Sequence, residues 1–444
     1  MSKAHLTTGS VNAHLIKLAL PALIAIICTF SFIVVDTYFI SILGQNELTA
    51  ISYATPMIDM IIGVAIGIGI AISSVSARMI GAGDFQKVKA YILHSTIFCL
   101  LLSIVVSTLG ILNINSVFIA LGAKGRPLAE IHNFMFVWYI GIFLLIMGFV
   151  ASNALRANGK AKGPAMVQIL MALINLALDP VFMFVLKLDI MGAAIAGLIA
   201  RTIGFVILMR MLVHYDVITL NLKENISGII NSWKKIISIS IPACLTNMIG
   251  PLATFWITYL LAMTGQAAVA GFGIATKAQM VAVIPLFVLS ASIGPVVGQN
   301  FSANKPERSF SALKTCAIFA VIWGALISLI LIFMAPYISG IFSSDAETIT
   351  VSNAYMYIVP VSYIGWGVIM MVSANFNSLG HPSRSTLISF TRMIVLFIPL
   401  SIILFQHIGY VGVFIAFSVA TLIVAALAYL WAYKDYKRLQ ASSI

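Results

Sequence analysis

Long apolar stretches alternate with short polar segments along the whole chain. Twelve of these stretches are long enough, at about 20 residues, to cross a bilayer as α-helices. We expect helices at residues 15–42, 50–79, 88–113, 130–156, 164–186, 191–213, 234–263, 272–301, 310–333, 350–378, 385–407 and 409–433. The pattern predicts an all-α membrane protein.

The composition of the 444 residues supports this reading. Apolar residues make up 61% of the chain and charged residues only 9%, with a mean hydropathy of +1.08. Water-facing domains carry roughly 25% charged residues, so lipid must solvate most of this exterior. A cytosolic enzyme, a nucleic-acid binder and a disordered scaffold are therefore excluded, and we expect no catalytic activity and no cofactor.

The positions of the basic residues predict the orientation in the membrane. The net charge is +12, and 19 of the 25 Lys and Arg residues lie at the two termini and in alternate loops, against three in the opposite loops. Basic loops stay on the cytoplasmic side. We expect a multi-pass protein of the cytoplasmic (inner) membrane with both termini in the cytoplasm. Cys28, Cys99, Cys244 and Cys316 all fall within expected spans, which argues against disulfides and a metal site.

The sequence repeats itself at an offset of about 221 residues. Leu15–Ala22 aligns with Ile236–Ala243, and Gly44-Gln45 aligns with Gly265-Gln266. Six helices separate the copies, so both share one orientation and should be related by a pseudo-twofold axis along the membrane normal. We expect a six-helix N-lobe at 1–213, a cytoplasmic linker at 214–233 and a six-helix C-lobe at 234–444. Two such bundles are typical of transporters that alternate access between the two sides.

Three acidic residues within expected spans distinguish the first half from the second. They are Asp36, Asp59 and Asp179, whose repeat partners are Ile257, Met280 and about Ile398. An ionised Asp in a span costs about 2.5–3.5 kcal/mol on insertion scales, so each needs a partner, a proton or water. These acids are candidates for the binding and release of a coupling cation, with Asp59 the weaker one because it could simply line an outward cleft.

Prolines accompany the two stronger acids. Asn175 and Asp179 stand four residues apart, on one face of a helix, and Pro180 frees a backbone carbonyl near position 176. Pro21 precedes Asp36 by fifteen residues, about 22 Å along a helix, so a bend there would displace the Asp36 end. Arg201, near the middle of its span, is a possible partner of Asp179.

These residues resemble the multidrug and toxic compound extrusion (MATE) family over nearly the whole chain. The motifs that carry the resemblance are Pro21 with Val34-Val35-Asp36-Thr37, Gly81-Ala82-Gly83, and Asn175-Leu176-Ala177-Leu178-Asp179-Pro180. Together with the lack of an acid in the seventh span, they resemble the DinF-like branch. The resemblance implies that Asp36, Asn175 and Asp179 couple to a cation, that Asn153 supports them, and that protonation accompanies bending at Pro21.

One departure from the branch bears on the coupling ion. The branch is associated with a hydroxyl residue in the sixth span near the carboxylates, whereas this span has none before Thr202. Sodium needs several oxygen ligands, by analogy with other hard cations. The sequence therefore favours proton coupling, with sodium at Asp36, Asn175 and Asp179 as the alternative.

The expected substrates are amphipathic organic cations, exported by a monomer. Aromatic rings offer cation–π contacts and methionine adapts to varied shapes. Candidate lining residues are Tyr38, Tyr139, Trp366, Met370 and Met371. A flippase for lipid-linked precursors is the main alternative, and it would use Arg201, Lys277 and Arg392 for anionic head groups. A transporter of the major facilitator type would have a motif of acidic and basic residues in the loop after the second span, and Arg78–Lys89 matches that motif poorly. A channel would need a repeated ring of charged residues to select ions.

Overall fold

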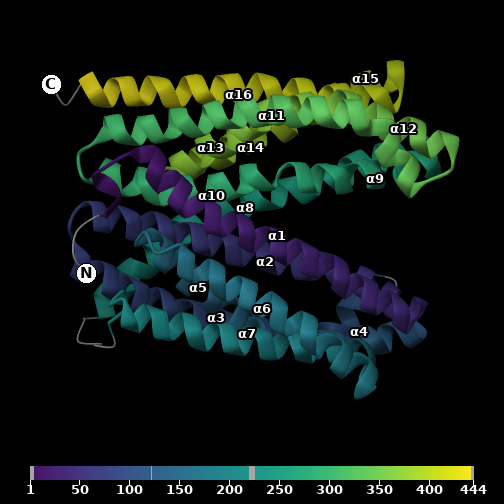
Figure 1. The fold of residues 1–444 in the computed structure, drawn as a ribbon, viewed down its shortest axis with the longest axis horizontal. Helices are drawn as coiled ribbons and strands as arrows, with labels where there is room; N and C mark the ends of the chain where they lie inside the picture. The colour runs from purple at the N-terminus through teal and green to yellow at the C-terminus, as the bar shows by residue number, and fades with distance from the viewer. Residues whose placement is uncertain (1–4, 122, 220–225, 442–444) are drawn as a thin grey trace. The chain divides into compact units, whose positions relative to one another are not determined.

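The computed structural model describes residues 5–121, 123–219 and 226–441, and every regular element in these ranges is a helix (Figure 1). The first half contains η1 (His5–Thr7), α1 (Val11–Leu43), α2 (Gln45–Gly81), α3 (Phe85–Ala120), α4 (Gly125–Ile140), α5 (Ile142–Ala157), α6 (Lys162–Pro180), η2 (Val181–Val185) and α7 (Asp189–His214). The second half contains α8 (Ile226–Ala262), α9 (Gln266–Ala282), α10 (Ile284–Ser302), α11 (Pro306–Phe342), α12 (Ala346–Ile358), η3 (Val359–Ser362), α13 (Tyr363–Leu379), α14 (Pro382–Phe390), η4 (Thr391–Phe397), α15 (Ile398–Ile408) and α16 (Tyr410–Ala441).

The number of spans agrees with the sequence. Among the described residues, eleven helices are long and apolar enough to cross a membrane, and a twelfth results if α4 and α5, which meet at 43°, form one bent span. The prediction of an all-α membrane protein is confirmed. The helix α8 starts at Ile226, earlier than the expected residue 234, so part of the expected linker is helical.

Several spans are interrupted where the sequence suggested continuous helices. Pro285 lies in the first turn of α10, and Pro360 lies in the 3₁₀ segment η3. Proline removes a backbone donor and clashes with the preceding turn, which breaks a helix. Gly141, between α4 and α5, has no proline beside it; a Cβ atom there would stand 3.0 Å from Leu198, so the glycine lets α7 approach closely.

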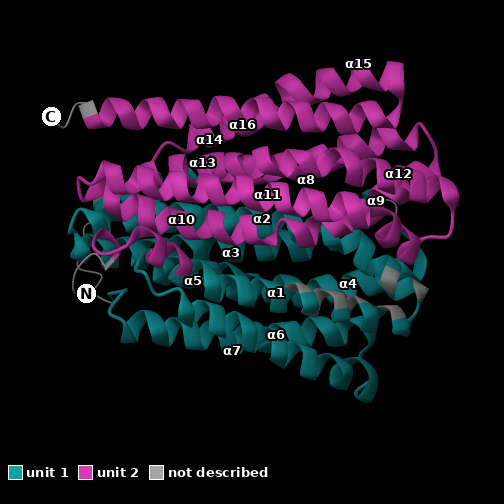
Figure 2. Cartoon of the chain, turned by 45° about the horizontal axis from the view of Figure 1, so that its top comes forward, with its two compact units in different colours: residues 1–5, 17–240 teal, residues 6–16, 241–444 magenta. Residues whose placement is uncertain are grey.

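The chain divides into two compact units (Figure 2). Unit 1 contains residues 1–5 and 17–240, and unit 2 contains residues 6–16 and 241–444. The first residues of α1 therefore belong to unit 2, and the first residues of α8 belong to unit 1. The sequence repeat gives no sign of this exchange.

Hydrogen bonds fix the segment 6–16 within unit 2. The backbone N–H of Leu6 donates to Gln299 Oε1 (3.3 Å), and Asn300 Nδ2 donates to the carbonyl of Leu6 (3.0 Å). Lys305 Nζ donates to the carbonyl of Thr7 at 3.0 Å. Both Leu6 and Thr7 are buried, so this segment is an integral part of unit 2.

The start of α8 is fixed within unit 1 in a corresponding way. Trp233 Nε1 donates to the carbonyl of His94 (3.0 Å) on α3. Ile236 and Ile239 pack in a buried cluster with Tyr91. The side chains of α8 before residue 241 thus complete the packing of α3.

The duplication is visible in the backbone conformation. Positive φ angles recur at positions 220 or 221 residues apart, in the pairs Gly44 (148°) and Gly265 (147°), Gly83 (81°) and Asn304 (57°), Gly159 (75°) and Gly380 (87°), and Asp189 (48°) and Gly409 (61°). Such conformations are uncommon outside glycine, so their recurrence at one offset is strong evidence for two copies of one architecture.

Candidate functional site

The side chains of Asn175 and Asp179 contact each other on α6. Asn175 Nδ2 donates a hydrogen bond of 2.6 Å to Asp179 Oδ1, as the four-residue spacing predicts. Asp179 is completely buried, and its second oxygen, Oδ2, has no hydrogen-bond partner among the described residues. The amide thus fixes one carboxyl oxygen and leaves the other without a donor.

The helix changes its geometry directly after this pair. Pro180 ends α6, and the next five residues form the π-helix η2. Leu186 N donates to the carbonyl of Val181 (2.9 Å), a bond across five residues instead of four. Single π turns inside helices are rare and are frequent at functional sites. The carbonyl near position 176 that Pro180 is predicted to free stays a prediction.

Packing one turn beyond the acids brings α1 to η2 and α7. Ile40 and Met183, each four residues after one of the acids, share a buried cluster with Ala193 of α7. The rings of Phe39 and Phe184 meet edge to face with centroids 6.1 Å apart. These contacts pack the part of α1 that follows Asp36 against the residues that follow Asp179.

Asp36 itself is partly buried on α1. Its Oδ1 atom has no hydrogen-bond partner among the described residues, and its charge is near enough to act on Asp179. A buried polar atom without a partner costs about 1–3 kcal/mol, and two neighbouring anions repel. A proton or another cation at this pair would offset both costs. The neighbouring side chains of Val34 and Thr37, part of the sequence motif, lie outside the described residues.

The face of α7 toward this pair is made of small residues. A Cβ atom on Gly197 would stand 3.5 Å from Asn175 Oδ1, and Ala193 is buried one turn earlier. Thr202 is exposed and donates to the carbonyl of Leu198 (2.8 Å). The oxygen atoms of the described site therefore come from two carboxyls and one amide.

The residues predicted to support the site have other described contacts. Asn153, on α5, donates to the carbonyl of Phe149 (2.9 Å), and its amide lies where a side chain on Gly69 would be. Asp59 is exposed on α2. The guanidinium of Arg201 lies 5.8 Å from the ring centroid of Trp138, and an ion pair with Asp179 is not found in the described part of the chain. Pro21 lies inside α1, which is continuous through it.

The five candidate lining residues differ in exposure. Tyr38 is 62% exposed, whereas Tyr139 and Met371 are 4% and 0% exposed. Trp366 is partly buried against Phe287 and Tyr363. Met370, also partly buried, accepts a hydrogen bond at its carbonyl from Ser290 (3.3 Å). Tyr139 and Met371 pack inside their units, and the role of the five in substrate binding stays a prediction.

The second half has different chemistry at the corresponding positions. Ile257, the repeat partner of Asp36, is buried. Beside it, Trp256 Nε1 donates to Ser401 Oγ (2.9 Å), which connects α8 to α15. A comparison of the two halves of the sequence that considers only acidic residues misses this contact between two uncharged side chains.

Two basic residues of the second half also have aromatic neighbours. Lys277 lies 5.9 Å from the ring centroid of Phe342. Arg392 is 9% exposed in η4, lies 5.8 Å from the ring centroid of Phe417, and its Nη1 atom has no hydrogen-bond partner in the described ranges. The burial of Arg392 could not be read from its sequence position.

Comparison with known proteins places the chain in a family. A family model described as MatE matches residues 21–181 and again 242–403, one match in each half. The chain is 30% identical over 442 residues to a protein named FAD transporter from Shewanella oneidensis, covering 99% of this chain and 98% of that one. It is 23% identical over 425 residues to the multidrug export protein MepA of Staphylococcus aureus, covering 94% and 92% of the two chains.

Solved structures give the same result. The Vibrio cholerae MATE transporter VcmN in its bent form superposes with a TM-score of 0.92 at 26% identity, covering 97% of this chain and 98% of that one. The duplicated all-helical fold and the family match define a multi-pass membrane transporter and not an enzyme. The chain belongs to the multidrug and toxic compound extrusion family.

Proposed function

We propose that this transporter is an antiporter, a monomer that exports amphipathic, mostly cationic organic compounds in exchange for a cation bound at Asp36, Asn175 and Asp179. The observation that supports it best is the pair of buried carboxyl oxygens, Asp36 Oδ1 and Asp179 Oδ2, that lack hydrogen-bond partners. A proton on either oxygen turns it into a donor and removes one of two neighbouring negative charges. Asn175 keeps Asp179 in one orientation while this happens.

A proton fits this site better than sodium. Sodium needs several oxygen ligands, and α7 presents Ala193 and Gly197 to the site instead of a hydroxyl residue. One elementary charge moved through 100 mV supplies about 2.3 kcal/mol, and one pH unit adds about 1.4 kcal/mol per proton. Together these would sustain several-hundredfold accumulation of an uncharged substrate; when one proton enters for each monovalent cation that leaves, no net charge moves, and one pH unit sustains about tenfold accumulation of the cation.

The transport cycle that we propose alternates the access of two lobes, 1–213 and 234–444, in a cytoplasmic membrane with both termini inside. Uptake of the proton from outside neutralises one of the two acids, changes the packing of α1 against η2 and α7, and is followed by release of the drug. Release of the proton to the cytoplasm restores the repulsion between Asp36 and Asp179.

Proteoliposomes test the proposed coupling directly. Efflux of a fluorescent organic cation is measured with a pH gradient and a sodium gradient imposed separately, each at zero membrane potential. We expect the pH gradient alone to drive efflux. Efflux driven by sodium alone would identify the alternative ion, and efflux that neither gradient accelerates would contradict the coupling site.

A second candidate substrate follows from the relative named FAD transporter, which is 30% identical over almost the full length of both chains. FAD carries an anionic diphosphate, so its export would need basic side chains instead of an acidic attraction. The same proteoliposomes loaded with FAD distinguish the two substrate classes. The remaining alternative, a flippase for lipid-linked precursors, predicts transport of neither compound.

A further inference from the structure

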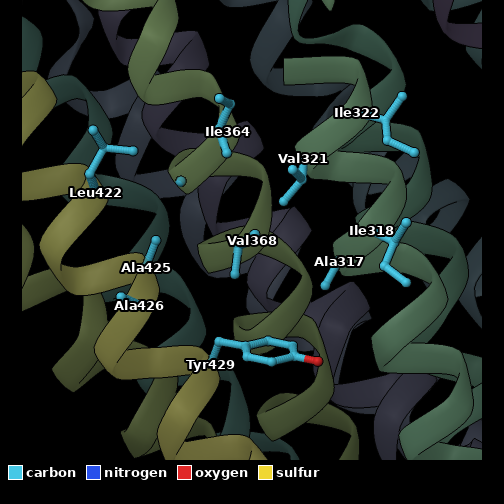
Figure 3. Close-up of a pocket in the computed structure, with 11 residues that line it drawn as sticks. Ala317, Ile318, Val321, Ile322, Ile364, Val368, Leu422, Ala425, Ala426 and Tyr429 are labelled. Carbon is cyan, nitrogen blue, oxygen red and sulfur yellow. The ribbon is translucent and has the colours of Figure 1, made fainter. Parts of the chain in front are cut away.

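A groove in unit 2 lies outside the site described above. It has a volume of about 400 Å³ and is formed by α11, α13 and α16 (Figure 3). Ile318 and Val321 form one wall, Ile364 and Val368 the floor, and Leu422 and Ala426 the other wall. Every lining side chain is apolar except Tyr429, whose ring lies at one end of the groove (Figure 3).

Small residues keep the groove open. Ala317, Gly365 and Ala425 lie in it, and their side chains are too short to fill it. A Cβ atom on Gly365 would stand only 3.1 Å from the Cβ atom of Ala425, so α13 and α16 are in close contact below it. The helix α13 packs against both α11 and α16 and therefore holds the two walls in place.

The groove opens to the surroundings of the protein. Ile318 and Ile322 on one rim are 49% and 62% exposed, and Leu422 on the other is 37% exposed. All three lie within helices long and apolar enough to span a membrane. Exposed apolar side chains in such helices match the hydrocarbon of lipids in polarity.

Lysines lie beyond one end of the groove. Lys314 precedes Ile318 by four residues and therefore shares its face of α11. On α16 the same four-residue step leads from Tyr429 to Tyr433 and then to Lys437. Both lysines are exposed.

An aromatic contact brings these two helix ends together. The rings of Phe310 and Tyr433 have centroids 5.8 Å apart, so the start of α11 lies beside the end of α16. Asp435, the acid nearest to Lys437 in sequence, is paired with Arg384.

The length of α11 places Lys314 near the membrane surface. At 1.5 Å per residue its 37 residues extend about 55 Å, whereas the hydrocarbon layer is about 30 Å thick. The first turns of α11 therefore extend beyond the hydrocarbon, and Lys314, about 12 Å from the helix start, lies close to the depth of lipid phosphates.

We propose that this groove binds one acyl chain of an anionic phospholipid whose phosphate lies between Lys314 and Lys437. The apolar groove between spanning helices provides the site for the chain, and the two cations at its end select the negative head group. A free phosphate would not use the groove, and a zwitterionic lipid would gain little from the lysines.

Ala426→Phe tests the acyl-chain part of the proposal. Ala426 is an exposed wall residue, so a larger ring can fill the groove without separating the helices. The full-length protein is titrated with phosphatidylglycerol in detergent and examined by native mass spectrometry. We expect the wild type to retain one lipid per monomer and Ala426→Phe to lose it. Leu427→Phe, on a neighbouring face and 58% exposed, is the matched control and should behave as the wild type.

Val321→Phe fills the groove from the opposite wall and serves as a second variant. Retention of one phosphatidylglycerol by both groove variants would overturn the proposal. A wild-type dimer that both variants convert to a monomer would also overturn it, because a second copy of the chain would then be the occupant.

Lysine variants test the head-group part. Lys314→Gln and Lys437→Gln should each lower retention of phosphatidylglycerol about fivefold, as expected for a basic residue beside an anionic lipid surface, and leave retention of phosphatidylcholine unchanged. Lys235→Gln, an exposed lysine of unit 1, is the control. Equal retention of the two lipids by the wild type would overturn the proposed selection of anionic lipid.

Discussion

Single residues of one type have very different surroundings in this transporter. Asp179 is completely buried with one oxygen bonded to Asn175 and the other without a partner, whereas Asp59 is exposed on α2. Burial without a partner makes the free energy of the site depend on whether a cation is bound.

Neutral substitutions should separate these acids. If the proposed coupling site is right, Asp36→Asn and Asp179→Asn each remove a group that binds the cation, so each should lose the roughly tenfold accumulation of a cationic dye that one pH unit sustains. Asp59→Asn should have little effect. Efflux of a cationic dye from proteoliposomes measures all three, with a monodisperse size-exclusion profile as the check on folding. Wild-type efflux by Asp36→Asn and Asp179→Asn would contradict the site.

A loop residue gives a prediction for stability against pH. Asp345 caps α12 by accepting hydrogen bonds from the Oγ1 and N atoms of Thr348 at 2.6 and 2.8 Å. These bonds from Thr348 hold the pKa of Asp345 below its usual value. A lowered pKa in the folded state means that the stabilisation is present above the usual Asp pKa and is lost as the pH falls through the folded-state value.

Asp345→Ala should therefore lower the melting temperature near neutral pH. The difference from wild type should shrink in acid, as the wild-type cap is protonated. Thermal unfolding in detergent across a pH series measures it. A difference that stays constant down to the acid range would mean that the charge on Asp345 has no part in the cap.

The sequence predicts residue contacts only where they are local. The hydrogen bond between Asn175 and Asp179 follows from a four-residue spacing on one helix. The stacking of Arg201 on Trp138 and the burial of Tyr139 and Met371 do not. Membrane helices are apolar on all sides, so periodicity does not distinguish a face in the core from a face toward lipid.

At the scale of elements, the single helix α1 contains both Pro21 and Asp36. Pro21 leaves the carbonyl of Lys17 without its usual helix donor, which makes this point of α1 easy to bend. Pro21→Ala restores the bond, so transport should fall while the amount of protein in the membrane stays the same. Pro336→Ala, in the interior of α11, is the matched control. Unchanged efflux by Pro21→Ala, measured beside its membrane abundance, would show that the bend has no function.

A second element-scale prediction concerns the start of α9. Gly265 has φ 147° and ψ 169°, a region almost restricted to glycine, and an added Cβ atom would meet no neighbour within 4 Å. Gly265→Ala should therefore destabilise by about 1–3 kcal/mol through backbone strain alone. Gly250→Ala inside α8, also without close neighbours, should not lower the melting temperature. Equal melting temperatures for both variants would contradict this explanation.

The sequence predicted the membrane spans but not the positions at which their helices break. A window of about 20 apolar residues detects a span whether or not it is bent, so the break between α4 and α5 and the one between α9 and α10 were missed. The sequence predicted a freed carbonyl near position 176, before Pro180, and did not predict the π-helix η2 that follows Pro180. When proline removes a backbone hydrogen bond, the bonds that replace it depend on the packing of neighbouring helices.

At the scale of the whole molecule, the exchange of segments 6–16 and 226–240 between the units predicts the behaviour of a divided chain. Fragments 1–224 and 225–444 each lack a piece of their own unit. Neither should accumulate when produced alone, and both should accumulate and export dye when produced together. A fragment ending at Ser240, which retains Trp233 and Ile236, should be more abundant than fragment 1–224. Equal abundance of these two fragments would contradict the structural role of the segment.

The same exchange has a consequence for biosynthesis. Leu6 bonds to Asn300, 294 positions later in the chain, and ribosomes add about 5–20 residues per second. The earliest part of the nascent polypeptide therefore waits about 15–60 s for its native neighbour to emerge. The segment around Leu6, although made early, therefore cannot reach its final environment before about two thirds of the chain has been made.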